Sequence, residues 1–208
     1  MLEFNINNNK VFYEEHLDGG GTVFGVNCLK GETVQSYIKP GNVLEMCSGP
    51  GFMGFYLKFN GMCDKLTLSD INEQNVLYIN KTITENELEN VKFVKSNVFD
   101  SFQEGEIYDT IIGNLPHFKT PRPWGYKDVY EQLISLDLNM EIHKKFFKDA
   151  KNHMDDDSRI ILVENSGGVT FDDIVSMTKD DYEIQYTEYD RYGWIRDTKF
   201  YTIILKKK

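Results

Sequence analysis

The sequence predicts an α/β protein in which a doubly wound, mostly parallel sheet carries helices on both faces. Three observations predict this class. From residue 43 onward, segments of strand-forming residues alternate with segments of helical spacing. A glycine-rich turn joins the first of these strands to a helix. The last two strand-like segments, Tyr182–Tyr189 and Lys199–Leu205, can pair as an antiparallel hairpin around a loop at Asp190–Asp197.

The individual elements are predicted from the spacing of their apolar residues. The strands expected before the hairpin are Val43–Cys47, Leu66–Asp70, Val91–Lys95, Tyr108–Gly113 and Arg159–Val163. The expected helices are Met53–Phe59, Glu73–Thr84, Glu141–Met154 and Phe171–Met177. In the second of these helices, Val76, Ile79 and Ile83 share one face, as is typical of a helix that packs on a sheet. Strands that alternate with helices pair in parallel through right-handed crossovers.

Length and composition predict one globular domain. The chain has 208 residues, of which 40% are hydrophobic and 13% aromatic, enough to bury a core. No apolar run reaches the roughly 18 residues of a membrane span, and the first residues lack the basic and apolar regions of a signal peptide. The three cysteines, at positions 28, 47 and 63, have no metal-type spacing. We therefore expect a cytoplasmic protein without a metal site.

The charge of the chain bears on its partners. The formal net charge is −10, and such a surface repels phosphate backbones. Basic residues do cluster at Lys144, Lys145, Lys148 and Lys151 and at the tail Lys206–Lys208, but beside acidic residues or at a chain end they are expected to be solvated surface. The sequence contains no separate nucleic-acid recognition domain. A small molecule, a peptide or a protein is therefore the expected partner.

The segment Val43–Gly54 reads as a strand, a Gly-x-Gly-x-x-Gly turn and the start of a helix. Gly49 and Gly51 allow a sharp turn and leave room for a ligand, and Gly54 lets the helix pack closely on the strand. The alternative is an ordinary strand-to-helix turn. Together with the helix dipole, the glycines predict a nucleotide-like ligand at this turn.

Two acidic residues indicate which ligand the turn binds. Asp70 ends the second strand 19 residues after Gly51, close to the roughly 20-residue offset at which a carboxylate accepts hydrogen bonds from a ribose. Glu45 lies inside the otherwise apolar first strand, where a carboxylate needs a partner such as an ammonium group. NAD and S-adenosylmethionine (SAM) both carry a ribose, but only SAM has an amino-acid end. Glu45 therefore favours SAM.

The pattern Glu-x-Cys-x-Gly-x-Gly-x-x-Gly, followed by an acid-terminated strand, resembles the class I SAM-dependent methyltransferases. The resemblance covers residues 40–205 and implies a seven-stranded sheet with the last strand reversed. It also implies that the loop after the third strand holds the adenine, through Asn97 with Val98 as an apolar wall, or alternatively through Asp100. The cofactor contacts that follow are Glu45, Cys47, Gly49, Gly51, Asp70, Ile71, Asn97, Val98 and Asn114.

A second motif, Gly113-Asn114-Leu115-Pro116-His117-Phe118, lies at the end of the fourth strand. It resembles the Asn/Asp-Pro/Leu-Pro-Tyr/Phe/Trp/His signature of amino-group methyltransferases, which act on adenine N6, cytosine N4 or the glutamine amide of peptide release factors. The leucine in second place is similar to the ribosomal-RNA adenine dimethyltransferases, although those have an aromatic residue where this chain has His117. A plain strand-to-loop turn is the alternative, since Asn-x-Pro is frequent in loops.

The residues of this motif suit methyl transfer to nitrogen. The side-chain oxygen of Asn114 and the carbonyl of Leu115 are expected to accept the hydrogens of an NH₂ group and so aim its lone pair at the methyl. Pro116 stiffens the turn and has no N–H of its own. His117 is expected either to stack on a planar substrate, to take up the released proton, or simply to pack. Alignment then supplies most of the rate.

The remaining candidate residues lie outside the two motifs. Phe118–Tyr130 is expected to form an irregular loop over the acceptor pocket, with Arg122, Trp124 and Tyr126 as substrate contacts or as ordinary surface packing. Residues 1–39 are expected to be an N-terminal extension in front of the SAM-binding domain, 40–208. The glycines 19–21 of this extension are expected to form a mobile surface loop or a flap over the site. The histidines at 16, 143 and 153 are expected to be structural or exposed.

The sequence thus predicts a SAM-dependent methyltransferase that transfers a methyl group to an amino or amide nitrogen by direct SN2 displacement. Four alternatives remain open. The first is SAM-dependent transfer to oxygen or carbon, or another reaction of the sulfonium. The others are an RNA adenine N6-methyltransferase, an NAD-dependent oxidoreductase, and a nucleic-acid-binding protein with a degenerate ligand site.

Overall fold

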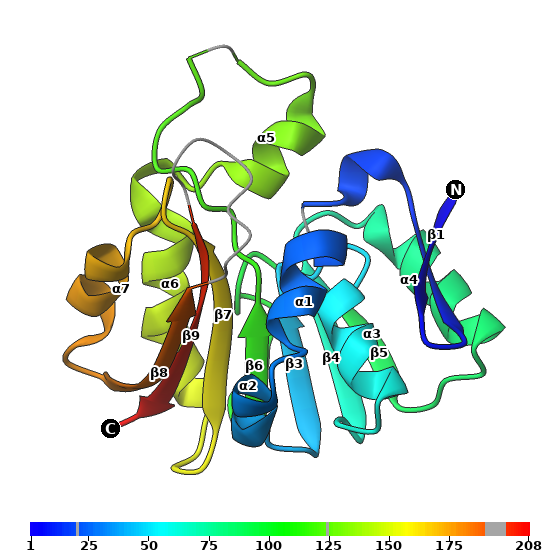
Figure 1. Cartoon of the computed structure of the whole chain (residues 1–208), viewed down its shortest axis with the longest axis horizontal. Helices are drawn as coiled ribbons and strands as arrows, with labels where there is room; N and C mark the ends of the chain where they lie inside the picture. The colour runs from blue at the N-terminus through cyan, green and yellow to red at the C-terminus, as the bar shows by residue number, and fades with distance from the viewer. Residues whose placement is uncertain (20, 124, 190–198) are drawn as a thin grey trace.

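The computed structural model describes residues 1–19, 21–123, 125–189 and 199–208, and its centre is a seven-stranded sheet (Figure 1). The strands lie in the order β5 (Val91–Lys95), β4 (Lys65–Asp70), β3 (Asn42–Met46), β6 (Thr110–Gly113), β7 (Arg159–Asn165), β9 (Phe200–Lys207) and β8 (Tyr182–Tyr189). The pairs from β5 to β7 are parallel, whereas β9 is antiparallel to both of its neighbours. The predicted fold class is confirmed, including the reversed last strand.

Helices cover both faces of this sheet, because neighbouring residues of each strand point to opposite sides. Val43 packs with α3 (Phe52–Phe59) and α4 (Asn75–Glu85), while Leu44 packs with α6 (Glu141–Ala150) and α7 (Phe171–Thr178). The same division separates Ile112 from Ile111 on β6. Two apolar cores therefore flank the sheet, as the doubly wound pattern predicts.

Apolar residues of the segments 1–19 and 21–39 are built into the first of these cores. β1 (Leu2–Ile6) and β2 (Asn9–Tyr13) form a hairpin that packs on α4, where the Phe12 amide donates to Thr82 Oγ1 at 3.0 Å. They are followed by a 3₁₀ turn (Glu15–Leu17), a π-helical turn (Gly21–Gly25), α1 (Val26–Cys28) and α2 (Glu32–Tyr37). This hairpin was not predicted from the sequence. Its signal is Asn7, which adopts φ 55° in the two-residue turn between Ile6 and Asn9.

Most of the other differences are at element ends. The helix expected over Glu141–Met154 ends at Ala150 and continues as a 3₁₀ turn, Lys151–His153. The strand expected from Tyr108 begins at Thr110, and α5 (Val129–Ser135) begins within the last two residues of the irregular loop expected over Phe118–Tyr130. Asp128 caps α5, since its side chain accepts a hydrogen bond from the Glu131 amide. A 3₁₀ turn, Leu138–Met140, joins α5 to α6.

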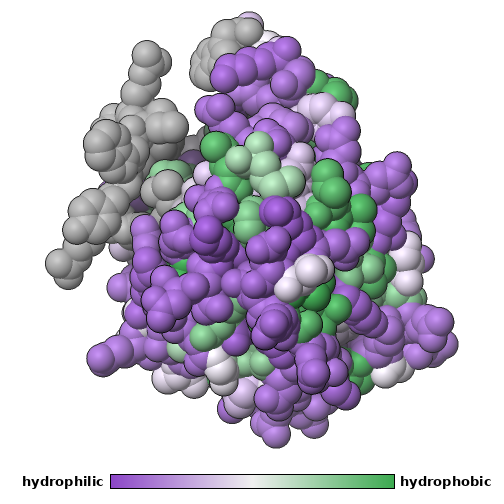
Figure 2. Space-filling view, turned by 90° about the vertical axis from the view of Figure 1, so that its right-hand side faces the viewer, coloured by the Kyte–Doolittle hydropathy of each residue, from purple (hydrophilic) through white to green (hydrophobic). Residues whose placement is uncertain are grey.

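The surface around α4 and the N-terminal hairpin is mostly hydrophilic (Figure 2). Hydrophobic residues are scattered over this face rather than gathered in one broad patch. Within the described ranges, no helix has the length and apolar composition needed to span a bilayer.

The start of α3 is pressed against the sheet at Gly54. A Cβ built there would lie 2.7 Å from Glu45 Oε2 and 2.8 Å from the side-chain ends of Leu66 and Leu68. The amide of Gly54 donates to Glu45 Oε2 at 2.7 Å. The close packing expected for the third glycine is therefore present, and it leaves no space for a methyl group.

We expect Gly54→Ala to lower the free energy of unfolding by about 1–3 kcal/mol, because the added methyl overpacks the contact between α3 and the sheet. Gly31→Ala is the control, since the nearest atom to a Cβ there is 3.8 Å away. Urea unfolding of both variants measures the difference. Equal stabilities of the two variants would contradict the steric role of Gly54.

Candidate active site

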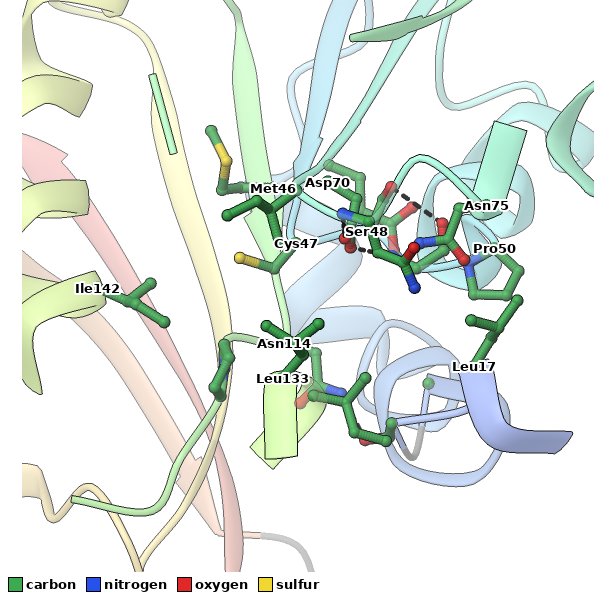
Figure 3. Close-up of a pocket in the computed structure, with 18 of the residues that line it drawn as sticks. Leu17, Met46, Cys47, Ser48, Pro50, Asp70, Asn75, Asn114, Leu133 and Ile142 are labelled. Carbon is green, nitrogen blue, oxygen red and sulfur yellow. Dashed lines mark hydrogen bonds between the residues drawn. The ribbon is translucent and has the colours of Figure 1, made fainter. Parts of the chain in front are cut away.

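A pocket opens at the carboxyl ends of the parallel strands, beside β3 and β6 (Figure 3). The strand order changes direction between these two neighbouring strands (Figure 1). Open α/β sheets bind ligands at this place. Its wall comes from the glycine turn, the ends of β4 and β5, the loop after β6, α5, and the segment that precedes α1. The expected cofactor contacts that line it are Glu45, Cys47, Gly49, Asp70, Ile71, Asn97, Val98 and Asn114.

Gly51 stands behind the pocket wall, where it starts α3. Its φ is 88°, and a Cβ would lie 2.7 Å from Leu68 Cδ1 and about as close to the Phe55 ring. A side chain at this position would therefore be strained and crowded at once. Gly51 shapes the turn, while the neighbouring residues face the pocket.

Asp70 ties the glycine turn to the end of β4. Its Oδ2 accepts a hydrogen bond from the Gly49 amide, and its Oδ1 accepts one from the Asn72 amide, both at 2.8 Å. Burial raises the pKa of this carboxyl, and the backbone donors Asn72, Gly49 and Ile71 oppose that rise. Each carboxylate oxygen has a further lone pair, so Asp70 can still accept from a ligand hydroxyl in the pocket.

Glu45 is a buried carboxyl beside the pocket. It is 3% exposed, and burial raises its pKa to about 8, although the Gly54 and Met53 amides donate to it. Without a cationic partner, most of this group is protonated at neutral pH. A cation that reaches the carboxylate would favour its ionised form.

Asn75, at the start of α4, was not singled out from the sequence. It is 2% exposed and lines the pocket, on the same side as Ser48 and Asp70 (Figure 3). Among the described residues, its Oδ1 has no hydrogen-bond partner. Since an unsatisfied buried acceptor costs about 1–3 kcal/mol, Asn75 is poised to accept from a ligand. Its signal in the sequence was a polar residue at i−4 from Ile79, on the buried face of α4.

Asn114 joins the second motif to the pocket. Its Oδ1 lies 3.1 Å from Nε2 of His117, and its Nδ2 donates to the Gly19 carbonyl at 3.2 Å. Pro116 also lines the pocket, whereas Leu115 is buried at 1% exposure in the sheet core. His117 is 8% exposed, and its ring does not line the pocket.

Behind His117, a chain of buried ionisable side chains runs through the protein. His117 Nδ1 lies 3.2 Å from Glu164 Oε2, and Glu164 Oε1 lies 3.1 Å from His143 Nε2. His143 Nδ1 is 2.6 Å from Asp137 Oδ2. We call Asp137, His143, Glu164 and His117 the buried ionic chain. His143 was expected to be structural or exposed, and the roles of the two acids were not predicted. The partners of Glu164 lie 21 and 47 residues away in the sequence.

The charges in the buried ionic chain shift one another. Burial alone lowers the pKa of His143, but the charge of Glu164 and the hydrogen bond to Asp137 outweigh it and raise the pKa to about 9. Burial raises the pKa of Glu164, but the charge of His143 and the hydrogen bond from His117 lower it to about 2. At neutral pH the structure therefore holds an imidazolium between carboxylates.

Arg122 and Tyr126, which were expected to touch a substrate, do not line the pocket, and Arg122 contacts α5 instead. Arg122 Nη1 lies 2.8 Å from Glu131 Oε1, and the guanidinium lies 4.9 Å from the centre of the Phe118 ring. The hydroxyl of Tyr126 accepts a hydrogen bond from the Arg122 amide at 3.3 Å. Trp124 lies outside the described residues. Substrate contact by these three residues stays a prediction.

Comparison with known proteins identifies the family. The model of the methyltransferase small domain matches residues 3–188, most of the chain. The chain belongs to the methyltransferase small domain family. It therefore carries a SAM-dependent methyltransferase domain, and S-adenosyl-L-methionine is the cofactor of this domain, as the glycine turn and its acids predicted. The family match also begins well before residue 40, in agreement with the packing of the first residues into the core.

Two curated relatives are release factor glutamine methyltransferases. The chain is 30% identical to that of Fusobacterium nucleatum over 100 residues, 48% of this chain and 26% of the relative. It is 29% identical to that of Leptospira interrogans over 108 residues, 50% of this chain and 38% of the relative. The matched part is thus well under half of either relative's length.

Solved structures share the fold at low identity. A protein of Pyrococcus horikoshii OT3 matches with a TM-score of 0.65 and 13% identity, over 95% of this chain and 100% of its own. The tRNA m1G37 methyltransferase of M. jannaschii matches with a TM-score of 0.62 and 16% identity, over 99% of this chain and 56% of its own. TrmK of M. capricolum, solved with S-adenosylhomocysteine, matches with a TM-score of 0.59 and 13% identity, over 86% of this chain and 70% of its own.

The buried ionic chain makes stability depend on pH. Because the pKa of His143 is raised from 6.5 to about 9, its contribution is fully present below pH 6.5 and is lost as the pH rises through 9. The shift corresponds to about 3 kcal/mol. We expect His143→Gln to abolish this part of the decline in unfolding free energy between pH 6.5 and 9, measured by urea unfolding. Parallel pH profiles of variant and parent would contradict the ion pairs.

Proposed function

We propose that this protein transfers a methyl group from SAM to an amino or amide nitrogen of a peptide or protein. The observation that carries the proposal is the position of Asn114 and Pro116 on the pocket wall, at the end of β6 and beside the glycine turn. The two curated relatives, named for methylation of a release-factor glutamine, support an amide acceptor. A net charge of −10 weighs against an RNA acceptor, although tRNA methyltransferases share the fold.

The residues of the pocket fit SAM. The unpartnered Oδ1 of Asn75 needs a hydrogen-bond donor, and the buried carboxyl of Glu45 needs a cation or a proton. Asp70 keeps free lone pairs for hydroxyl groups. A nucleoside with an amino-acid end supplies hydroxyl donors and an ammonium group. When bound, SAM supplies a methyl group activated by a positive sulfur.

The acceptor nitrogen would be oriented by the end of β6. The Asn114 Oδ1 already faces His117, but a carbonyl oxygen accepts two hydrogen bonds, so one lone pair is left for an NH₂ hydrogen. We assign the second hydrogen to the Leu115 carbonyl, as the sequence motif predicts. Pro116 offers no competing N–H. Since the His117 ring is almost buried, we place it behind Asn114 and not against the substrate.

Direct displacement asks little else of the protein. Asn114 and Leu115 hold the nitrogen lone pair toward the methyl, and the apolar wall at Leu133, Leu136 and Ile142 limits access of water. We also propose that the protein acts in the cytoplasm, where Cys47 and Cys63, which are free thiols, would stay reduced.

We expect SAM and S-adenosylhomocysteine to raise the melting temperature, and NAD to leave it unchanged, because a ligand stabilises the protein when it binds the native state and not the unfolded state. Asp70→Ala should weaken SAM binding about tenfold or more in calorimetry. Glu73→Ala is the matched control, since it removes the same charge from an exposed side chain three residues away that pairs with Lys95. Equal affinities of the two variants would refute the role of Asp70.

We expect Asn114→Ala to lower turnover by about a hundredfold or more while the dissociation constant of SAM changes less than about threefold, since the side chain orients the acceptor. Isotope-labelled SAM with cell extract, followed by mass spectrometry, identifies the methylated acceptor and measures the rate. The exposed Asn152, changed to alanine, is the control. Retained turnover in the Asn114 variant would exclude an NH₂ group held at this position.

A further inference from the structure

The buried ionic chain leads to Asn114, the side chain that we propose orients the methyl acceptor. Asp137 comes from the turn before α6, His143 from α6, and Glu164 from β7, so three separate elements converge on His117. Asp137 is 1% exposed, and His143 and Glu164 are 0% exposed. Asp137 also accepts hydrogen bonds from the Ile142 and His143 amides, so it is held firmly at the start of α6.

The donors and acceptors of the chain allow one arrangement of protons. His143 lies between two carboxylates, so both of its ring nitrogens donate. Glu164 receives His143 on one oxygen and His117 on the other. His117 Nδ1 therefore donates to Glu164, while its Nε2 faces Asn114 Oδ1, which is also an acceptor. A proton on both nitrogens of His117 satisfies every contact and also brings the net charge of the chain to zero.

This arrangement selects the orientation of the Asn114 amide. The oxygen and nitrogen of an asparagine side chain are nearly equal in size, so the amide can turn over without a steric penalty. When Nε2 of His117 carries a proton, it donates a hydrogen bond, and only the amide orientation with Oδ1 toward the ring can accept it. The Gly19 carbonyl requires the same orientation, because it can bond only to Nδ2. With a bare Nε2, the reversed amide would pair with His117 instead.

We propose that Asp137, His143 and Glu164 are positioning residues that keep His117 a donor on both ring nitrogens and thereby fix the Asn114 amide with its oxygen toward the ring. This inference rests on the proposed function, because the held oxygen is the one that would meet the acceptor nitrogen. A reversed amide would present an NH₂ group where the acceptor brings its own. In the described parts of the chain, no three His, Cys, Asp or Glu side chains, those of the buried ionic chain included, are placed so that they could hold one metal ion.

Other ionisable groups face the buried ionic chain. Tyr201 on β9 and Cys47 on the glycine turn interact with Glu164, and Cys47 also with Asp137. Burial raises the pKa of both groups, so they stay neutral at pH 7. Phe200 packs edge-on against the His117 ring with 6.0 Å between ring centres. At neutral pH the proton count is therefore set within the chain itself.

The proposal is tested by nitrogen NMR of the full-length protein at pH 7, with ¹⁵N-labelled histidine and no ligand. We expect protons on both ring nitrogens of His117 and of His143, each assigned by its loss in a His→Gln variant. In Glu164→Gln, the neutral amide removes the negative charge that balances the second proton of His117, so His117 should keep the proton on Nδ1, which donates to the amide oxygen, and should show a bare Nε2. A bare Nε2 on His117 in the parent protein overturns the proposal, and that measurement needs no variant to fold.

Kinetics then separate positioning from cofactor binding. Glu164→Gln should lower kcat about tenfold or more, with the KM for the acceptor and the dissociation constant of SAM each changed less than about threefold. Glu183→Gln removes the same charge from an exposed position on β8 and should match the parent. An unchanged kcat in folded Glu164→Gln overturns the positioning role. Absence of SAM binding by the parent protein would instead refute the proposed function, and the NMR result would stand apart from it.

Discussion

The site depends on one close approach, that of the first turn of α3 to the end of β3. Gly54 can lie against Glu45 because it has no side chain, and its amide then donates to the buried carboxyl. Gly51, with φ 88°, makes the preceding turn, and the Gly49 amide is drawn to Asp70 on β4. These contacts place a helix N-terminus and two carboxyl groups around one pocket. Such a combination suits a ligand that carries both hydroxyl and cationic groups.

The two halves of the site are held by different kinds of interaction. On the side of β3 and β4, backbone amides shape the pocket, and Asn75 and Glu45 keep polar groups unsatisfied or protonated. On the side of β6 and β7, side chains satisfy one another completely from Asp137 to Asn114. The first half is thus ready to exchange partners for a ligand, whereas the second is ready to keep its geometry. A transferase needs both, since the cofactor must come and go while the acceptor is aligned.

The sequence predicted the parts of the structure that local pattern determines. The strands at the sheet centre are short apolar runs, and Gly49, Asp70 and Asn114 lie at their ends or within three residues of them, so their meeting at one sheet edge follows from parallel order. The N-terminal hairpin was missed because its asparagine turn carries a weaker signal than a glycine turn. Asp137, His143 and Glu164 were missed for another reason. Their roles come from contacts across as many as 47 residues, which no periodicity encodes.

The buried ionic chain is better explained by orientation than by stability. Replacing a buried ion pair by apolar side chains is often neutral or stabilising, because the charges lose their hydration, whereas removing one partner is costly. An apolar residue at 117 would have no need of Glu164, His143 or Asp137. With histidine at 117, Glu164 pairs with its ring, His143 pairs with Glu164, and Asp137 pairs with His143. The series ends at Asp137, which accepts hydrogen bonds from backbone amides at the start of α6. At its other end lies Asn114, on the pocket wall. The desolvation cost of these buried charges is therefore explained if the orientation of the Asn114 amide matters at the pocket wall.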